Sequence, residues 1–177
     1  MYLHAVSSPP DQGAGGAASR PSRAHRYALV TARLVSALAL LATGAIHIQQ
    51  YYVADYRVIP TIGTLFLLNF IGGTVLGLYL LIPARVASGR VRRLADTVAA
   101  LSGLGVAVTS LIALLVSEHT PLFGFMEHGY RLEIVVAIVA EAVATVALGG
   151  FLLLNHRAGG RRPYLRTHRP GPVAVTS

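Results

Sequence analysis

Four long apolar runs make up most of residues 27–155, and few polar positions interrupt them. A helix needs about 20 apolar residues to cross the hydrocarbon layer of a membrane, and each run is long enough. A soluble protein would not be expected to contain four such runs in succession. The pattern predicts an all-α, polytopic membrane protein, a bundle of four transmembrane helices with spans at about 34–53, 59–82, 94–116 and 132–154.

The two ends of the chain lack this pattern. Residues 1–26 are rich in Ser, Pro and Gly, and residues 156–177 are rich in Gly, Pro and Arg. Segments of this composition bury too little apolar surface to offset the conformational entropy lost on folding. We expect a disordered N-terminal tail and a disordered, basic C-terminal tail on either side of the four-helix domain.

The distribution of arginine predicts the orientation of the bundle. All 15 basic residues are Arg, and all except Arg57 and Arg131 lie in the tails, just before the first span or between the second and third spans. Because Arg is retained on the cytoplasmic side, both termini are predicted to be cytoplasmic, and the 49–58 and 117–131 loops to face outward. The predicted location is the bacterial cytoplasmic (inner) membrane. A cleaved signal peptide over Arg26–Ala45 is the alternative, although its apolar run is longer than usual.

The composition narrows the classes of function. Hydrophobic residues make up 54% of the chain and charged residues 12%, which is about half the charged fraction of a soluble domain. The chain has no Cys, which excludes disulfide scaffolds, thiolate metal sites and Cys nucleophiles. It also has no phosphate-binding glycine loop and no Ser-His-Asp ordering typical of hydrolases, and this favours a non-enzymatic protein. The expected partners are the lipid bilayer and either further copies of the chain or a larger membrane complex. No nucleic acid is expected, because no aromatic residues alternate with the arginines.

Glu141 and Asn69 are the most unusual residues for a membrane interior. Each lies about 14 Å below the outer end of its span at the helical rise of about 1.5 Å per residue. An ionisable side chain at this depth is costly unless it is paired, protonated or hydrated, and no span offers a Lys or Arg partner. Small residues on the same two stripes would let the second and fourth spans approach closely, either within one chain or at an oligomer interface, so that Asn69 donates to Glu141. The stripe residues concerned are Gly73, Gly77, Thr145 and Gly149.

Two interpretations of Glu141 stay open. It could relay protons or cations, or it could be a protonated side chain that joins helices through a hydrogen bond. His47, in the first span, offers the same choice between a proton or metal site and a simple hydrogen bond, and Thr109 and Ser110 lie at a similar depth. Asp96, near the start of the third span, is expected to cap the start of that helix.

Several outer residues could bind a metal ion together with His47. Imidazole and carboxylate groups are ligands that zinc, copper(II) and nickel accept. The alternative is an interfacial loop, whose aromatic residues anchor at the headgroups while its charges face water. Only His47 lies inside a span, which excludes a two-haem cytochrome, and no specific cofactor is implied. The candidate metal ligands are His47, Glu118, His119, Glu127 and His128.

The chain resembles small four-helix integral membrane proteins of actinobacteria, some of which are similar to the DoxX-like group. The segments that carry this resemblance are Gly44–His47, Tyr51–Tyr52 and Ile59–Asn69. The resemblance covers about residues 34–154 and rests on the architecture and on a His followed by Pro and Gly. It implies a four-helix membrane fold, but no activity and no functional residues.

Three functions are compatible with these features. The first is a non-enzymatic accessory or interaction subunit, favoured by the small size and the helix-packing glycines. The second is a small oligomeric proton- or ion-coupled transporter that uses Glu141, with Asn69 and His47 nearby. The third is a membrane redox or metal-handling component that uses the outer His residues.

Overall fold

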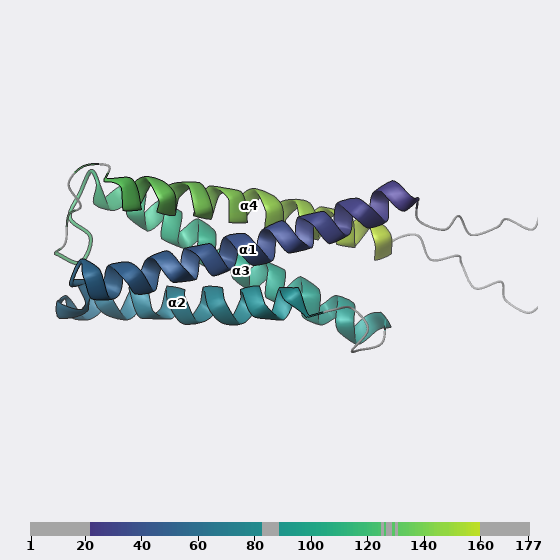
Figure 1. Cartoon of the computed structure of the whole chain (residues 1–177), viewed down its shortest axis with the longest axis horizontal. Coiled ribbons are helices and arrows are strands. Elements are labelled where there is room, and N and C mark those ends of the chain that lie inside the picture. Colours follow the sequence, from purple (N-terminus) through teal and green to yellow (C-terminus); the bar gives the residue numbers. More distant parts are fainter. Residues whose placement is uncertain (1–21, 83–88, 125, 127–128, 130, 160–177) are drawn as a thin grey trace, which may run out of the picture.

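Four long helices account for nearly all of the part of the chain that the structure describes (Figure 1). The structure is a computed structural model, and it describes residues 22–82, 89–124, 126, 129 and 131–159. Each long helix is long and apolar enough to cross a membrane, which confirms the prediction of four candidate spans. The helices are α1 (Arg23–Val53), α2 (Pro60–Leu81), α3 (Gly89–Ser117) and α4 (Leu132–Gly159), and the short 3-10 helix η1 (Tyr56–Val58) precedes α2.

The outer ends of the helices agree with the predicted spans to within one residue, whereas the inner ends of α1, α3 and α4 extend beyond them. The end of α1 at Val53 and the start of α4 at Leu132 match the prediction. In contrast, α1 begins at Arg23 and so includes the last residues of the predicted N-terminal tail. The Ser22 side chain accepts a hydrogen bond of 3.2 Å from the His25 backbone N–H and caps this end. An apolar run marks the part of a helix suited to lipid, whereas the helix itself continues to its cap.

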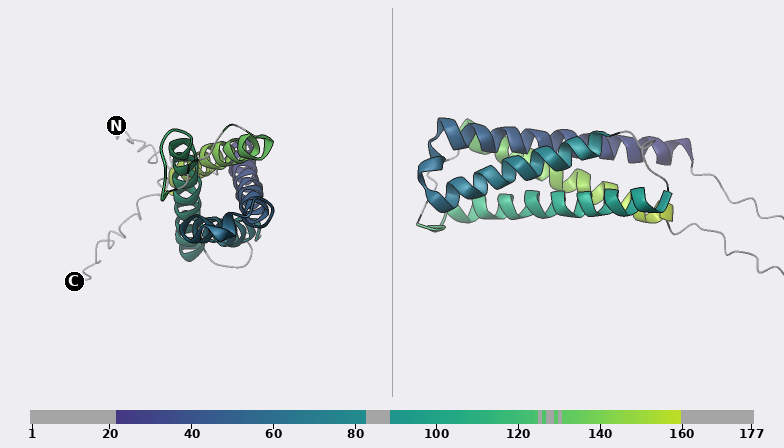
Figure 2. Two further views of the ribbon diagram at one scale, coloured as in Figure 1. Left: turned by 90° about the vertical axis from the view of Figure 1, so that its left-hand side faces the viewer. Right: turned by 90° about the horizontal axis from the view of Figure 1, so that it is seen from below.

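The helices form a ring in chain order, as the end-on view shows (Figure 2, left). α1 packs against α2 and α4, and α3 packs against the same two helices from the opposite side. The start of α1 and the end of α4 lie at the same end of the bundle, together with the end of α2 (Figure 1). We call this the inner end and the opposite end the outer end, after the predicted orientation.

Within one chain, the predicted close approach of the second and fourth spans is wrong, because α2 and α4 lie diagonally across the ring. The glycines of α2 pack against α1 instead. A Cβ atom added to Gly73 would lie 2.7 Å from the Leu40 carbonyl oxygen, and one added to Gly77 would lie 3.0 Å from the Ala37 carbonyl oxygen. Gly149 on α4 has no such neighbour within 4 Å. Small residues thus bring α1 and α2 together, and the polar residues of α2 and α4 meet by another route.

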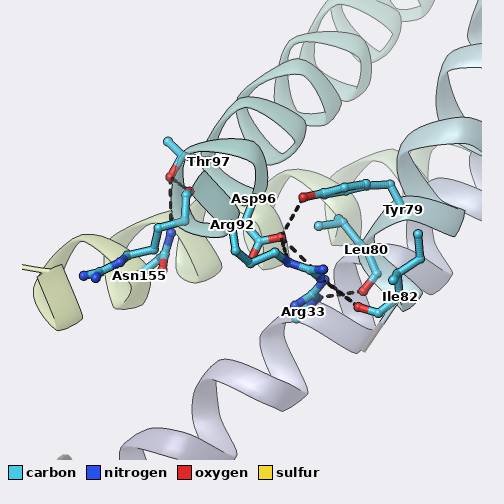
Figure 3. Close-up of polar contacts among 9 residues, drawn as sticks. Arg33, Tyr79, Leu80, Ile82, Arg92, Asp96, Thr97 and Asn155 are labelled. Atoms are coloured by element: carbon cyan, nitrogen blue, oxygen red, sulfur yellow. Dashed lines mark hydrogen bonds and ion pairs between the residues drawn. The ribbon is translucent and has the colours of Figure 1, made fainter. Parts of the chain in front are cut away.

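A charged network ties α1, α2 and α3 together at the inner end (Figure 3). Asp96 Oδ1 accepts hydrogen bonds from Arg92 Nε at 2.9 Å and from the Tyr79 hydroxyl at 3.2 Å, and Arg33 Nη2 lies 3.5 Å away. The same two arginines donate to the Ile82 carbonyl, at 3.0 Å from Arg33 and 2.8 Å from Arg92. The prediction that Asp96 caps the third span is therefore wrong. The helix begins at Gly89, and Asp96 instead holds the arginines that cap the end of α2.

Apolar side chains fill the inner half of the bundle. Leu40, Leu80 and Leu148 are fully buried or nearly so, and a Cβ added to Gly103 would lie 3.0 Å from Leu40 and 3.4 Å from Leu148. Alanines between these leucines let the helices pack closely. The buried members of this core are Ala37, Ala39, Leu40, Leu80, Ala99, Ala100, Ala107, Ala144, Leu148 and Phe151.

Candidate functional site

Four polar side chains, one from each long helix, gather in the outer half of the bundle. We call His47, Asn69, Ser110 and Glu141 the polar site. Ser110 on α3 is its centre, with its hydroxyl oxygen 3.1 Å from His47 Nε2 and 3.4 Å from Asn69 Nδ2. The carboxyl group of Glu141 lies close enough to the same hydroxyl to interact with it. The three intramembrane candidates predicted from the sequence therefore share one partner.

His47 is buried and held in a defined orientation, with 6% of the residue exposed. Its Nδ1 lies 2.8 Å from the Thr43 carbonyl oxygen one turn earlier in α1. A carbonyl oxygen only accepts hydrogen bonds, so Nδ1 carries the hydrogen and neutral His47 presents Nε2 as an acceptor to Ser110. The ring also packs against Phe66, with the ring centroids 5.0 Å apart. These contacts direct Nε2 toward the centre of the bundle.

Glu141 is the most deeply buried ionisable residue of the polar site, with 1% of its surface exposed. Its Oε1 lies 3.8 Å from His47 Nε2, and its Oε2 has no hydrogen-bond partner among the described residues. The predicted direct bond from Asn69 is not formed, because Asn69 donates to Ser110 instead. The reason is the ring order, in which α3 lies between α2 and α4. Glu141 thus has a free, buried oxygen.

A cavity lies directly above the polar site and reaches toward the outer end. Its volume is about 100 Å³, and its lining comes from the outer halves of all four helices, from η1 and from Leu122. His47, Ser110 and Glu141 lie at its deep end, and Ala137 and Glu133 line it one and two turns above Glu141 on α4. Most of the other lining side chains are apolar. We call this space the outer cavity.

The short helix η1 brings Tyr56 over the outer cavity. Asp55, before it, adopts a left-handed backbone conformation with φ of 56°, which turns the chain sharply after α1. Gly63 then allows the start of α2 to pass close to η1, since a Cβ at this position would lie 2.8 Å from the Tyr56 carbonyl oxygen. Tyr56 is buried, and its hydroxyl accepts a hydrogen bond of 3.2 Å from Arg131 Nη2. This bond joins η1 to the start of α4 across the outer end.

The structure does not gather the candidate metal ligands that it describes. His119 is exposed just after α3 and Glu118 is partly buried, whereas His47 belongs to the polar site. Glu127 and His128 lie outside the described residues. No group of three His, Asp or Glu side chains able to hold a metal ion occurs within the described ranges. The outer metal site stays a prediction from the sequence.

Comparison with known proteins gives no match to a family model, a curated protein or a solved structure. The resemblance to actinobacterial four-helix membrane proteins therefore stays a prediction.

Proposed function

We propose that this chain is a non-enzymatic, multi-pass membrane protein that binds a small ligand in the outer cavity, as an accessory or interaction subunit. The observation that carries this proposal is the free, buried Oε2 of Glu141 at the deep end of the cavity. An unpartnered polar atom in an apolar interior costs free energy that a bound group could recover. A few polar groups converging in a mostly apolar cavity are typical of small-molecule sites.

The proposed orientation places the cavity on the outer side of a bacterial cytoplasmic membrane. Among the described residues, Arg57 and Arg131 are the only arginines near the outer end, while those of the inner end include Arg23, Arg33 and Arg92. This asymmetry supports cytoplasmic termini. A ligand would then enter from outside the cell, or from the outer leaflet.

The packing of the inner half favours binding over transport. Leu40, Ala144 and Leu148 are fully buried directly below the polar site and belong to a continuous apolar core. A carrier needs access to its site from each side in turn. Access from one side alone suits a protein that senses or holds a ligand and passes this information to a partner in the membrane.

The experiment is labelling of single cysteines in a chain that has no native Cys. Ala137 lines the cavity, and Ala144 lies two turns deeper on the same face of α4 and is fully buried. A small, impermeant, cationic methanethiosulfonate reagent added to intact cells should modify Ala137→Cys and leave Ala144→Cys unmodified. Protection of Ala137→Cys from the outside, together with reaction in inverted vesicles, would contradict the proposal.

A proton- or ion-coupled carrier is the second candidate, favoured by the 3.8 Å separation of His47 Nε2 and Glu141 Oε1. Two adjacent titratable groups inside a membrane are a feature of proton pathways. Proton flux into vesicles containing the purified chain separates the two functions. The binding proposal predicts no flux in the parent. A flux that is lost in Glu141→Gln, with helix content unchanged by circular dichroism, would establish the carrier instead.

A further inference from the structure

We propose that the outer cavity binds a small organic cation, an ammonium group on a short apolar body, with Glu141 as its counter-ion. This inference rests on the proposed function, since it names the chemical class of the ligand for the same cavity. It is carried by three independent features of the cavity, namely its charge, its hydrogen-bonding groups and its aromatic wall.

The charges around the cavity favour a positive ligand. Among the described residues that line it, Glu133 and Glu141 are the carboxylates, and His47 is the one side chain able to carry a positive charge. Glu141 is 1% exposed, and the structure describes no Arg that pairs with it, since Arg33 and Arg92 bind Asp96 at the inner end. A buried carboxylate is costly unless it is protonated or a cation accompanies it. A ligand cation would supply that charge.

The hydrogen bonds of the polar site are short of donors. Neutral His47 presents Nε2 as an acceptor because its Nδ1 hydrogen binds the Thr43 carbonyl. The single hydroxyl hydrogen of Ser110 is therefore directed to His47, while Glu141 Oε2 has no partner among the described residues. An ammonium group brings up to three N–H donors and accepts nothing, so it matches this imbalance. A carboxylate or a phosphate would add further acceptors.

Aromatic rings line the path from the outer end to Glu141. Phe66 is the centre of this wall, with its ring centroid 4.7 Å from that of Tyr56 and 5.0 Å from that of His47. The faces of such rings attract cations, most strongly where water is excluded. A cavity of about 100 Å³ is smaller than the roughly 150 Å³ cavity known to admit benzene, so the apolar body fits about four carbon atoms.

The test uses n-butylammonium as the probe, with butan-1-ol and butyrate as neutral and anionic molecules of matched size. The full chain is purified in detergent, and thermal unfolding is followed by circular dichroism at constant ionic strength. A ligand that binds only the folded state, present at a concentration of about 100 times its Kd, should raise the Tm of a chain of this size by roughly 5–11 °C. We expect a saturable rise with n-butylammonium and none with the other two probes.

Two variants assign the effect to the cavity. Glu141→Gln keeps the size and the hydrogen-bonding capacity of the side chain but removes its charge, and it should abolish the rise. Ala137→Leu keeps Glu141 and fills the cavity above it, so it should also abolish the rise. An undiminished rise in either variant, or an equal rise with butan-1-ol, would overturn the inference.

The outcomes for the two proposals are distinguishable. If Ala137→Cys is labelled from outside but n-butylammonium does not stabilise the chain, the ligand class is wrong and the outward-facing binding site stands. If Ala137→Cys is protected from outside and the probe has no effect, both proposals fail.

Discussion

Replacement of Gly73 by Ala tests the close contact between α1 and α2. The new methyl carbon would lie 2.7 Å from the Leu40 carbonyl oxygen and 3.2 Å from the Gly44 nitrogen. Carbon–oxygen contacts between helices are ordinarily about 3.3–3.6 Å, so the two backbones must separate by about 0.6 Å or more. Because both partners are backbone atoms, no side-chain rotation can relieve the overlap. We expect a loss of about 1–3 kcal/mol in the free energy of unfolding, or roughly 2–12 °C in Tm.

Gly72→Ala is the matched control, one position earlier on the same helix. Its Cβ would lie 3.7 Å from Val106 Cγ2, an ordinary contact, and the gain in helix propensity is up to about 1 kcal/mol. The measurement is thermal unfolding in detergent, followed by far-ultraviolet circular dichroism. The Tm of Gly72→Ala should equal or exceed that of the parent, and the Tm of Gly73→Ala should lie below it. Equal Tm values for the two variants would refute the role given to the α1–α2 contact.

Three further predictions concern the charged network, the polar site and the orientation. Asp96→Asn should lower the free energy of unfolding by roughly 3–5 kcal/mol, because it leaves two largely buried arginines without their counter-charge. Asp55→Asn, in an exposed ion pair, should change it by less than about 1 kcal/mol, and equal losses in chemical denaturation would contradict this ranking. Ser110→Ala should lower the free energy of unfolding by about 1–3 kcal/mol, since it removes the hydroxyl that binds His47 and Asn69; a parental Tm would show that these groups do not depend on it. In intact cells, Thr120→Cys should react with an impermeant thiol reagent and Arg157→Cys should not, and the reverse pattern would exclude cytoplasmic termini.

The four helices could be predicted from the sequence because apolar run length depends only on local composition. Their inner ends could not, because Arg33 and Arg92 look like charges that border a span. In the structure both lie within helices, and their guanidinium groups bind the Ile82 carbonyl at the end of α2. A pattern of hydropathy does not reveal such a partner, since the partner is a backbone group of another helix.

The depth of the polar residues was predictable, but their pairing was not. Asn69 and Glu141 lie at a similar depth in the bundle, as the helical rise predicts. The sequence also predicts that Ser110 lies at a depth similar to that of His47. Which of them meet depends on the order of the helices around the ring, and α3 places Ser110 between the other two. The small-residue stripe of α2 was also recognised, yet it packs on α1 rather than α4. Periodicity along one helix does not specify the partner helix.

The unequal lengths of the helices set the bilayer thickness that suits this bundle. α2 has 22 residues and so spans about 33 Å, close to a hydrocarbon layer of about 30 Å. Because Arg33 and Arg92 bind the carbonyl at the end of α2, the charged network lies where the hydrocarbon gives way to the headgroups. The ten residues of α1 that precede Arg33 then extend about 15 Å further, through the headgroup layer. A hydrocarbon layer thicker than the roughly 33 Å length of α2 would draw Asp96 and its arginines into hydrocarbon, so the network sets an upper limit on the bilayer thickness that suits the bundle.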